Sequence, residues 1–373
     1  MKRNICPFMV GAIIGLTFAT STMAQTADAA KWQELIKNAQ KEHSFGLVGP
    51  PDPHLRTDLP EAFTKRYGID VDYLPLNGAE TMTRVDLESK AGRTTIDAVI
   101  GGTGSCWTMV ERGQIENING KIIDPAVVDP SVWTGGSLRF IDGGPVPSGT
   151  PADFRCGFQP AEWVMTDLFV NTTVIRPGEI TSWKDLLKPE YKGRIVSYDP
   201  RRAGPATTTV SYLNYLFGQD FLKSLYLGQS VHFTADHRQL AEWVARGEYP
   251  IGLSLVQFAV EPFRRQGLPI ERVFPADGPG SVMGGFSVIA LVKNSAHPNA
   301  AQLFVNWYAT QEAQTIYERD MMEASLRKDV TGTNVPDYIR PKPGATYVDA
   351  YKYDYNENVR GPALDMLQKA LER

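Results

Sequence analysis

The sequence predicts an α/β fold in which helices flank mixed, mainly parallel sheets. Apolar residues recur at the helical spacing i, i+3, i+4 in segments that alternate with short β-branched runs, and glycine or proline closes most of these segments. The length of 373 residues is enough for two domains. The formal net charge of −4, without basic blocks, argues against nucleic-acid binding.

The N-terminus has the pattern of a secretory signal peptide. Lys2 and Arg3 precede an apolar run over residues 8–19, and residues 22–24, Thr-Met-Ala, form a small-residue cleavage site. The run is too short to span a membrane. We therefore expect residues 1–24 to be removed and the mature protein to be periplasmic.

The cysteines fit an oxidising compartment. Cys6 belongs to the signal peptide, which leaves Cys106 and Cys156 as an even pair. This predicts a disulfide between them, and two free buried thiols are the alternative.

The first half of the mature chain alternates helices and strands up to Gly113, whereas residues 114–160 are rich in Pro, Gly and Asp and carry no clear pattern. Gly68 and Gly92 are expected to stop the second and third helices. Helices are predicted over residues 32–39, 59–67, 81–91 and in the segment ending at Gly113, and strands over residues 45–48, 69–73 and 96–100.

Two loops of this half follow predicted strands, where ligands of open α/β sheets bind. They are Gly49–Asp52 and Gly101–Ser105. The second loop, Gly-Gly-Thr-Gly-Ser, offers free N–H groups and hydroxyls that suit a carboxylate or phosphate at a helix start. It lacks the Gly-Lys-Ser/Thr of a P-loop, and Trp107 stands where a dinucleotide fingerprint has its third glycine. A tight strand-to-helix turn is the alternative.

The second half continues the alternation. We expect a strand over residues 163–170 to carry the chain into a second lobe and a strand over residues 286–292 to return it. Further helices are predicted over residues 183–187, 205–217, 221–227, 237–245, 256–266, 300–317 and 364–371, and further strands over residues 194–198 and 249–256.

Residues 199–209 predict an anion site. Asp-Pro-Arg-Arg-Ala-Gly-Pro follows a strand, and Pro205 suits the first turn of a helix. A helix start presents free N–H groups and the positive end of the helix dipole to an anion. Arg201, Arg202 and Thr207 lie beside those groups. The alternative is that the arginines are solvated loop charges and the hydroxyls cap the helix.

Other kinds of site find little support. His232 and His237 lack zinc-ligand spacing, so no metal or cofactor is expected. No Gly-x-Ser-x-Gly elbow is present, which argues against a common hydrolase site. Trp107, Phe258 and Phe286 are candidates to line a pocket, although aromatic residues are more often part of the core.

Several segments carry a family resemblance. They include Trp183-Lys-Asp-Leu-Leu-Lys-Pro-Glu-Tyr-Lys-Gly-Arg-Ile195, Phe63-Thr-Lys-Arg-Tyr-Gly-Ile-Asp-Val71 and residues 296–307, Ala-His-Pro-Asn-Ala-Ala-Gln-Leu-Phe-Val-Asn-Trp. Together they resemble the extracellular solute-binding proteins of ABC importers, and most closely the branch that includes the ferric-iron binders. The resemblance covers nearly all of the mature chain.

The resemblance implies a two-lobed periplasmic-binding-protein fold of type II, with the ligand in the cleft between two α/β lobes. It also implies a monomer that serves an ABC permease at the inner membrane and is not an enzyme. The lobes are expected to comprise residues 25–165 with 280–330, and residues 166–279 with 331–373.

The sequence departs from the ferric binders at their iron ligands. Gln257 and Phe258 occupy the positions of the family's tyrosine pair, and Gly102 occupies that of an acidic ligand. Ferric iron favours anionic oxygen ligands, so we expect an organic ligand instead.

The expected function is capture of a small organic anion, such as a carboxylate, phosphate or phosphonate, by lobe closure. The alternatives are a binder of ferric iron, a binder of a cation such as thiamine or a polyamine through Asp52 or Asp199, and a secreted hydrolase with an α/β cleft. The candidate ligand-binding residues are Pro50, Thr103, Gly104, Ser105, Arg201, Arg202, Ala206, Thr207, Gln257, Phe258 and Phe286.

Overall fold

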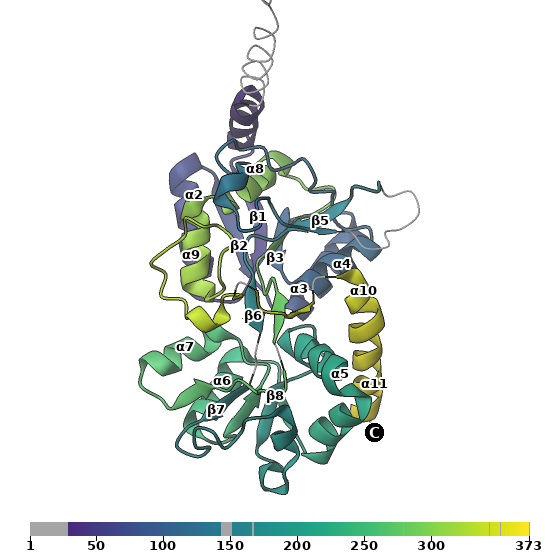
Figure 1. Cartoon of the computed structure of the whole chain (residues 1–373). Helices are drawn as coiled ribbons and strands as arrows, with labels where there is room; N and C mark the ends of the chain where they lie inside the picture. Colours follow the sequence, from purple (N-terminus) through teal and green to yellow (C-terminus); the bar gives the residue numbers. More distant parts are fainter. Residues whose placement is uncertain are drawn as a thin grey trace, which may run out of the picture.

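The computed structural model describes residues 29–142, 151–165, 168–278, 280–342, 344–350 and 352–372. The predicted signal peptide, with Cys6, lies outside these residues. The chain forms two α/β lobes, one above the other in Figure 1, with short strands crossing between them. The predicted two-lobed fold is therefore confirmed.

The first lobe is built on a six-stranded sheet in the order β2-β1-β3-β13-β5-β4. β2, β1 and β3 are parallel, whereas β13, β5 and β4 pair antiparallel, so the sheet is mixed but not mainly parallel. β13 comes from far along the chain, which means that this sheet is completed only by the returning segment. The strands are β1 (Ser44–Gly49), β2 (Asp70–Pro75), β3 (Ala98–Gly101), β4 (Phe140–Asp142), β5 (Arg155–Phe158) and β13 (Val288–Leu291).

Helices pack on both faces of this sheet around a buried aromatic group. Phe63 lies within 5.8 Å of Phe45 and 5.1 Å of Phe304, measured between ring centroids. Gly68 and Gly92 end their helices in the left-handed conformation, as predicted. The helices span residues 29–40, α2 (Leu55–Tyr67), α3 (Gly78–Ala91), α4 (Thr103–Glu111), α8 (Pro298–Tyr308) and α9 (Gln311–Met321), with a 3₁₀ turn η1 (Pro130–Val132).

The single helix predicted over residues 300–317 was wrong. The chain forms two helices, α8 and α9, separated at Ala309 and Thr310. Thr310 has an extended backbone, and its hydroxyl accepts a hydrogen bond from the Ala313 N–H. Such an N-cap starts a new helix at this point. The helical spacing of apolar residues continues across the break, which is why the sequence alone predicts one helix.

The second lobe is built on a five-stranded sheet in the order β11-β7-β10-β8-β9. β10, β8 and β9 are parallel, whereas β11, β7 and β10 pair antiparallel. The strands are β7 (Leu168–Asn171), β8 (Ile195–Tyr198), β9 (His232–Thr234), β10 (Ile251–Leu253) and β11 (Ile270–Arg272). The helices are α5 (Pro205–Lys223), α6 (His237–Arg246) and α7 (Gln257–Arg265), with the shorter turns η2 (Trp183–Leu187), η3 (Pro189–Tyr191), η4 (Ser224–Gly228) and η5 (Asp337–Ile339).

A third, three-stranded sheet lies between the lobes. β6 (Trp163–Met165) pairs antiparallel with β12 (Ser281–Met283), and β12 pairs in parallel with β14 (Val348–Asp349). The one strand predicted over residues 163–170 is therefore two, β6 and β7, which belong to different sheets. The chain changes hydrogen-bond partners as it passes from lobe to lobe, and a hydrophobic run alone does not reveal that change.

The C-terminal segment contacts both lobes. Its elements are α10 (Tyr353–Tyr355), η6 (Asn356–Arg360) and α11 (Gly361–Leu371), and Figure 1 shows α11 beside α5. Ala363 and Leu367 are buried in the core of the second lobe. Tyr353 instead meets Trp107 of α4, in the first lobe, with ring centroids 5.8 Å apart. The predicted lobe boundaries stay a prediction.

The predicted disulfide is not formed. Cys106 on α4 and Cys156 on β5 are buried, and no disulfide joins them. Burial, followed by the neighbouring Cys156 thiol, raises the pKa of the Cys106 thiol and favours its neutral form. In the described part of the chain, no helix has the length and apolar character needed to cross a membrane.

Candidate ligand site between the lobes

A cavity of ≈ 150 Å³ lies where the two lobes and the crossing strands meet. The first lobe contributes the ends of β1 and β3 and the start of α4, and the second lobe contributes the start of α5. Its lining includes Pro50, Thr81, Thr103, Gly104, Ser105, Trp107, Thr108, Trp163, Ala203, Thr207, Thr208, Met283, Phe286, Tyr355 and Arg360.

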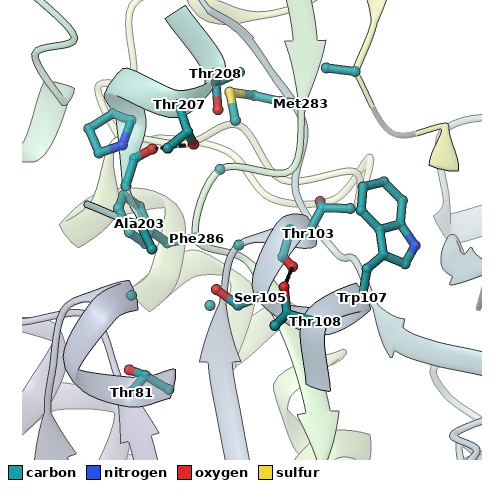
Figure 2. Close-up of a pocket in the computed structure, with 18 of the residues that line it drawn as sticks. Thr81, Thr103, Ser105, Trp107, Thr108, Ala203, Thr207, Thr208, Met283 and Phe286 are labelled. Atoms are coloured by element: carbon teal, nitrogen blue, oxygen red, sulfur yellow. Dashed lines mark hydrogen bonds between the residues drawn. The ribbon is translucent and has the colours of Figure 1, made fainter. Parts of the chain in front are cut away.

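The first turn of α4 forms one wall. Gly102 precedes it with an extended backbone and supplies no side-chain cap. The first N–H groups of a helix have no partner within the helix, so this end carries free donors and a partial positive charge. Figure 2 shows the side chains of Thr103 and Ser105 on this wall.

The first turn of α5 forms the opposite wall. Pro205 occupies the first helical turn, and Gly204 before it adopts a φ of 155°, with the ring of Tyr198 packed closely against it. The Thr207 hydroxyl donates to the Gly204 carbonyl over 2.7 Å. Figure 2 places Thr207 and Thr208 across the cavity from Ser105, so two helix N-termini, one per lobe, converge on the same space.

Arg360, from the C-terminal segment, also lines the cavity. Its Nη2–H donates to the Thr207 hydroxyl over 2.9 Å, and its Nη1–H donates to the Asn356 side-chain carbonyl over 3.1 Å. Desolvation lowers the pKa of the Arg360 guanidinium, and the nearby Tyr355 opposes this. Among the described residues, no carboxylate lies within ion-pair distance of Arg360.

The charge of the cavity is positive. Arg360 is the charged side chain among its described lining residues, and these include no Asp or Glu. A ligand here therefore meets one full positive charge, two helix N-termini and several hydroxyls. This arrangement favours an anion.

The rest of the lining is mostly apolar. Trp163 is 5 % exposed, and its indole N–H has no hydrogen-bond partner among the described residues. The Phe286 N–H donates to both oxygens of the buried Glu323 carboxyl, over 3.1 and 3.2 Å. Burial raises the pKa of Glu323 to about 8, against the lowering effects of Tyr317 and the Phe286 N–H. Glu323 thus supports the cavity wall as a mainly neutral acid at pH 7.

A second, larger cavity of ≈ 1020 Å³ opens between the lobes, toward α2, α7 and α9. Burial raises the pKa of Asp52 there, while hydrogen bonds from the Leu55 and His54 N–H groups lower it. Burial also lowers the pKa of His237 to about 4, so its ring is neutral at pH 7. The acidic lining residues are Asp52, Asp58, Glu80, Asp236, Glu261 and Asp320.

The structure brings about half of the predicted site residues together. Pro50, Thr103, Gly104, Ser105, Thr207 and Phe286 line the first cavity, and Phe258 lines the second.

The remaining predicted residues are placed elsewhere. Arg201 and Arg202 lie outside the linings of both cavities, and the Arg201 guanidinium pairs with both carboxylate oxygens of Asp199. Ala206 belongs to the first turn of α5 but is fully buried and does not line the cavity. Gln257 is 2 % exposed, and its side-chain amide has no hydrogen-bond partner among the described residues.

Sequence reasoning missed Arg360. It lies more than a hundred residues from α5 in the chain and belongs to no recognisable motif. Its place in the cavity wall follows from the packing of the C-terminal segment against α5. Within the described ranges, no group of three or more His, Cys, Asp or Glu side chains is arranged to hold a metal ion.

Comparison with known families agrees with this architecture. The sequence profile of the bacterial extracellular solute-binding proteins matches residues 23–315. The chain belongs to this family. It is a solute-binding protein of the kind that serves ABC transporters, and the family membership predicted from sequence is confirmed.

The relatives of this solute-binding protein differ in their ligands. It is 27 % identical over 247 residues to the spermidine/putrescine-binding periplasmic protein of Escherichia coli K12, covering 63 % of this chain and 65 % of that protein. The structure of the periplasmic binding protein AfuA from Actinobacillus pleuropneumoniae, with fructose-6-phosphate bound, matches with a TM-score of 0.68 at 17 % identity, covering 87 % of this chain and 98 % of that one.

Iron-bound HitA from Pseudomonas aeruginosa matches with a TM-score of 0.66 at 17 % identity, over the same shares of the two chains. At such low identities the two structural matches establish the shared fold.

Proposed function

We propose that this solute-binding protein captures a small organic anion in the periplasm, closes its lobes on it and delivers it to an ABC permease. The observation that carries the proposal is the convergence of two helix N-termini, from α4 and α5, on a cavity whose described lining contains no carboxylate. Each N-terminus acts as roughly half a positive charge at short range. An anion that contacts both would hold the lobes together.

The same geometry argues against a cation in this cavity. A metal ion or ammonium group would meet Arg360 and two positive helix ends, with no negative side chain in the described lining. Iron in particular would lack the tyrosine pair of the ferric binders, because Gln257 and Phe258 stand at those positions of the sequence and neither lines this cavity. Fructose-6-phosphate, the ligand of the structurally similar AfuA, is an organic anion of the proposed kind.

A polyamine is the second candidate, because of the second cavity. Its lining carries six acidic residues and three arginines. Arg265 pairs with Glu261, and Arg319 pairs with Asp58 and Asp320, whereas Asp52 and Asp236 cap helices and lack a cationic partner among the described residues. The polyamine-binding relative supports this reading.

Native mass spectrometry followed by a thermal-shift screen tests the proposal. Mature protein from residue 25 onward is screened with organic acids that include citrate, and with phosphonates, sugar phosphates, spermidine, thiamine and ferric citrate. Binding raises the melting temperature by mass action. Stabilisation by an anion supports the proposal, stabilisation by spermidine alone supports the second candidate, and stabilisation by ferric salt alone rejects both.

A further inference from the structure

We propose that Arg360 selects a doubly charged tetrahedral group, such as a phosphate monoester or phosphonate, over singly charged carboxylates and sulfate esters. The inference rests on the proposed function and narrows its ligand class. It also assigns a specificity role to the C-terminal segment, which lies outside both anion-binding helices.

The position of Arg360 leaves its charge without compensation. Its two hydrogen-bond partners, Thr207 and Asn356, are both neutral. A guanidinium has five N–H donors, and these two contacts use only two of them. In the described part of the chain, the donors that remain have no carboxylate to meet.

The neighbours of Arg360 make its positive charge unfavourable unless an anion compensates it. The guanidinium packs so closely against Gly104 that an added Cβ would collide with Nη1. Gly104 belongs to the first turn of α4, which carries a partial positive charge. A cation at this end of a helix has the wrong sign, and desolvation adds to the cost, which agrees with the lowered pKa of Arg360. A bound anion would relieve both effects.

The amount of positive charge indicates the charge of the ligand. Arg360 contributes one unit, and the two helix ends contribute roughly half a unit each, which gives about two units. A phosphate monoester carries about −1.5 to −2 charges at pH 7, whereas a carboxylate or sulfate ester carries one. A dianion neutralises the cavity, and a monoanion leaves it positive.

The directions of the donors also suit a tetrahedral group. α4, α5 and Arg360 approach from three elements, and the buried Trp163 on a fourth element has an indole N–H without a partner among the described residues. Three phosphate oxygens can each accept from a different element. Thr207 connects Arg360 to the start of α5, because its hydroxyl accepts from the Arg360 guanidinium and donates to the Gly204 carbonyl.

Three small probes test the selectivity without knowledge of the natural ligand. At pH 7, where Glu323 is mainly neutral, methyl phosphate is mainly a dianion, methyl sulfate has the same shape with one charge, and acetate is a planar monoanion. We expect wild-type protein to bind methyl phosphate at least tenfold more tightly than the other two, by calorimetry at millimolar concentrations. Arg360→Gln should lose at least tenfold in methyl phosphate affinity and most of this preference. Arg360→Lys should retain part of it, because it keeps the charge but not the fork of donors.

The matched control is Arg246→Gln, since Arg246 lies on the exposed side of α6 and pairs with Glu242. A second measurement uses only wild-type protein, so it remains valid if Arg360→Gln does not fold. Wild-type affinity for methyl phosphate should rise as the pH increases through the second phosphate pKa, near 6. That rise should be absent for methyl sulfate.

Failure of the inference is distinct from failure of the proposed function. If acetate or methyl sulfate binds as tightly as methyl phosphate, or if folded Arg360→Gln keeps the wild-type preference, Arg360 does not select a dianion although the protein binds anions. If none of the three probes binds and spermidine does, both proposals are wrong. Absence of methyl phosphate binding to folded wild-type protein also overturns the dianion assignment.

Discussion

At the scale of single residues, Glu323 and Arg360 are two ionisable groups beside the same cavity. Burial makes Glu323 mainly neutral at pH 7, whereas Arg360 stays charged. Glu323 is 3 % exposed and accepts hydrogen bonds from the Phe286 N–H and the Tyr317 hydroxyl. Its burial favours the neutral acid, so it holds the wall without adding a full negative charge at pH 7. Arg360 would have to lose a proton to become neutral, and it keeps that proton at pH 7 because the ordinary pKa of a guanidinium is far above neutrality.

Glu323 should make the protein less stable as pH rises. Its pKa is raised from 4.5 to about 8, so the folded state holds the proton more tightly than the unfolded state. The free energy of unfolding therefore falls between these two pH values and levels off above pH 8. Glu323→Gln, which keeps an acceptor for Phe286, should remove this fall and stabilise the protein at pH 8.5 by up to about 4 kcal/mol.

Urea unfolding at pH 5 and pH 8.5 measures this effect, with Glu34→Gln as an exposed control on the first helix. An equal pH dependence in wild type and Glu323→Gln would show that Glu323 does not titrate in this range.

Gly104 should matter for binding rather than for folding. Gly104→Ala places a methyl group where the Arg360 guanidinium lies, and the flexible arginine side chain can move away. We expect methyl phosphate affinity to fall severalfold while the free energy of unfolding changes by less than about 1 kcal/mol, since alanine suits a helical turn.

The control for this substitution is Gly228→Ala, where an added Cβ meets no atom closer than 4.0 Å. Unchanged affinity in Gly104→Ala would mean that Arg360 does not contact the ligand.

At the scale of elements, α4 and α5 follow parallel strands whose carboxyl ends point at the cleft. β3 leads into α4, and β8 leads through a loop into α5. In each lobe the helix begins just beyond the carboxyl end of a strand, which is where ligands of open α/β sheets bind. Both helix N-termini therefore lie at the cavity. Loop conformation then decides which side chains take part, and the pairing of Arg201 with Asp199 holds Arg201 away from the cavity.

The break between α8 and α9 depends on one cap. Thr310→Ala should lower the free energy of unfolding by about 1 kcal/mol, because the first N–H groups of α9 lose their side-chain acceptor. Urea unfolding of this variant is compared with Thr315→Ala, whose hydroxyl donates to the Gln311 carbonyl within the same helix. If both substitutions have the same effect, the Thr310 side chain does not act as a cap.

At the scale of the whole molecule, the cavity combines groups that no single lobe contains. A ligand that contacts α4, α5 and Arg360 joins the first lobe, the second lobe and the C-terminal segment. Hydrogen exchange should therefore slow on binding in residues 102–106 and 204–208 together, as measured by mass spectrometry with and without methyl phosphate. Slowing confined to one of these segments would contradict a site shared between the lobes.

The fold class, most elements and two of the three parts of the proposed anion site follow from local patterns in the sequence. Helical and strand periodicities are local, and so are the glycine stops at Gly68 and Gly92. The Gly101–Ser105 loop and the helix start at Pro205 were recognisable because a helix N-terminus attracts anions wherever it occurs.

Which charged side chains reach the cavity depends instead on packing between distant segments. Arg201 is next to the helix start in sequence, yet it pairs with Asp199, whereas the distant Arg360 arrives through the packing of α11 on α5. The division of residues 163–170 between two sheets likewise depends on strand partners far along the chain. Long-range packing sets these contacts, and neither periodicity nor spacing in the sequence encodes them directly.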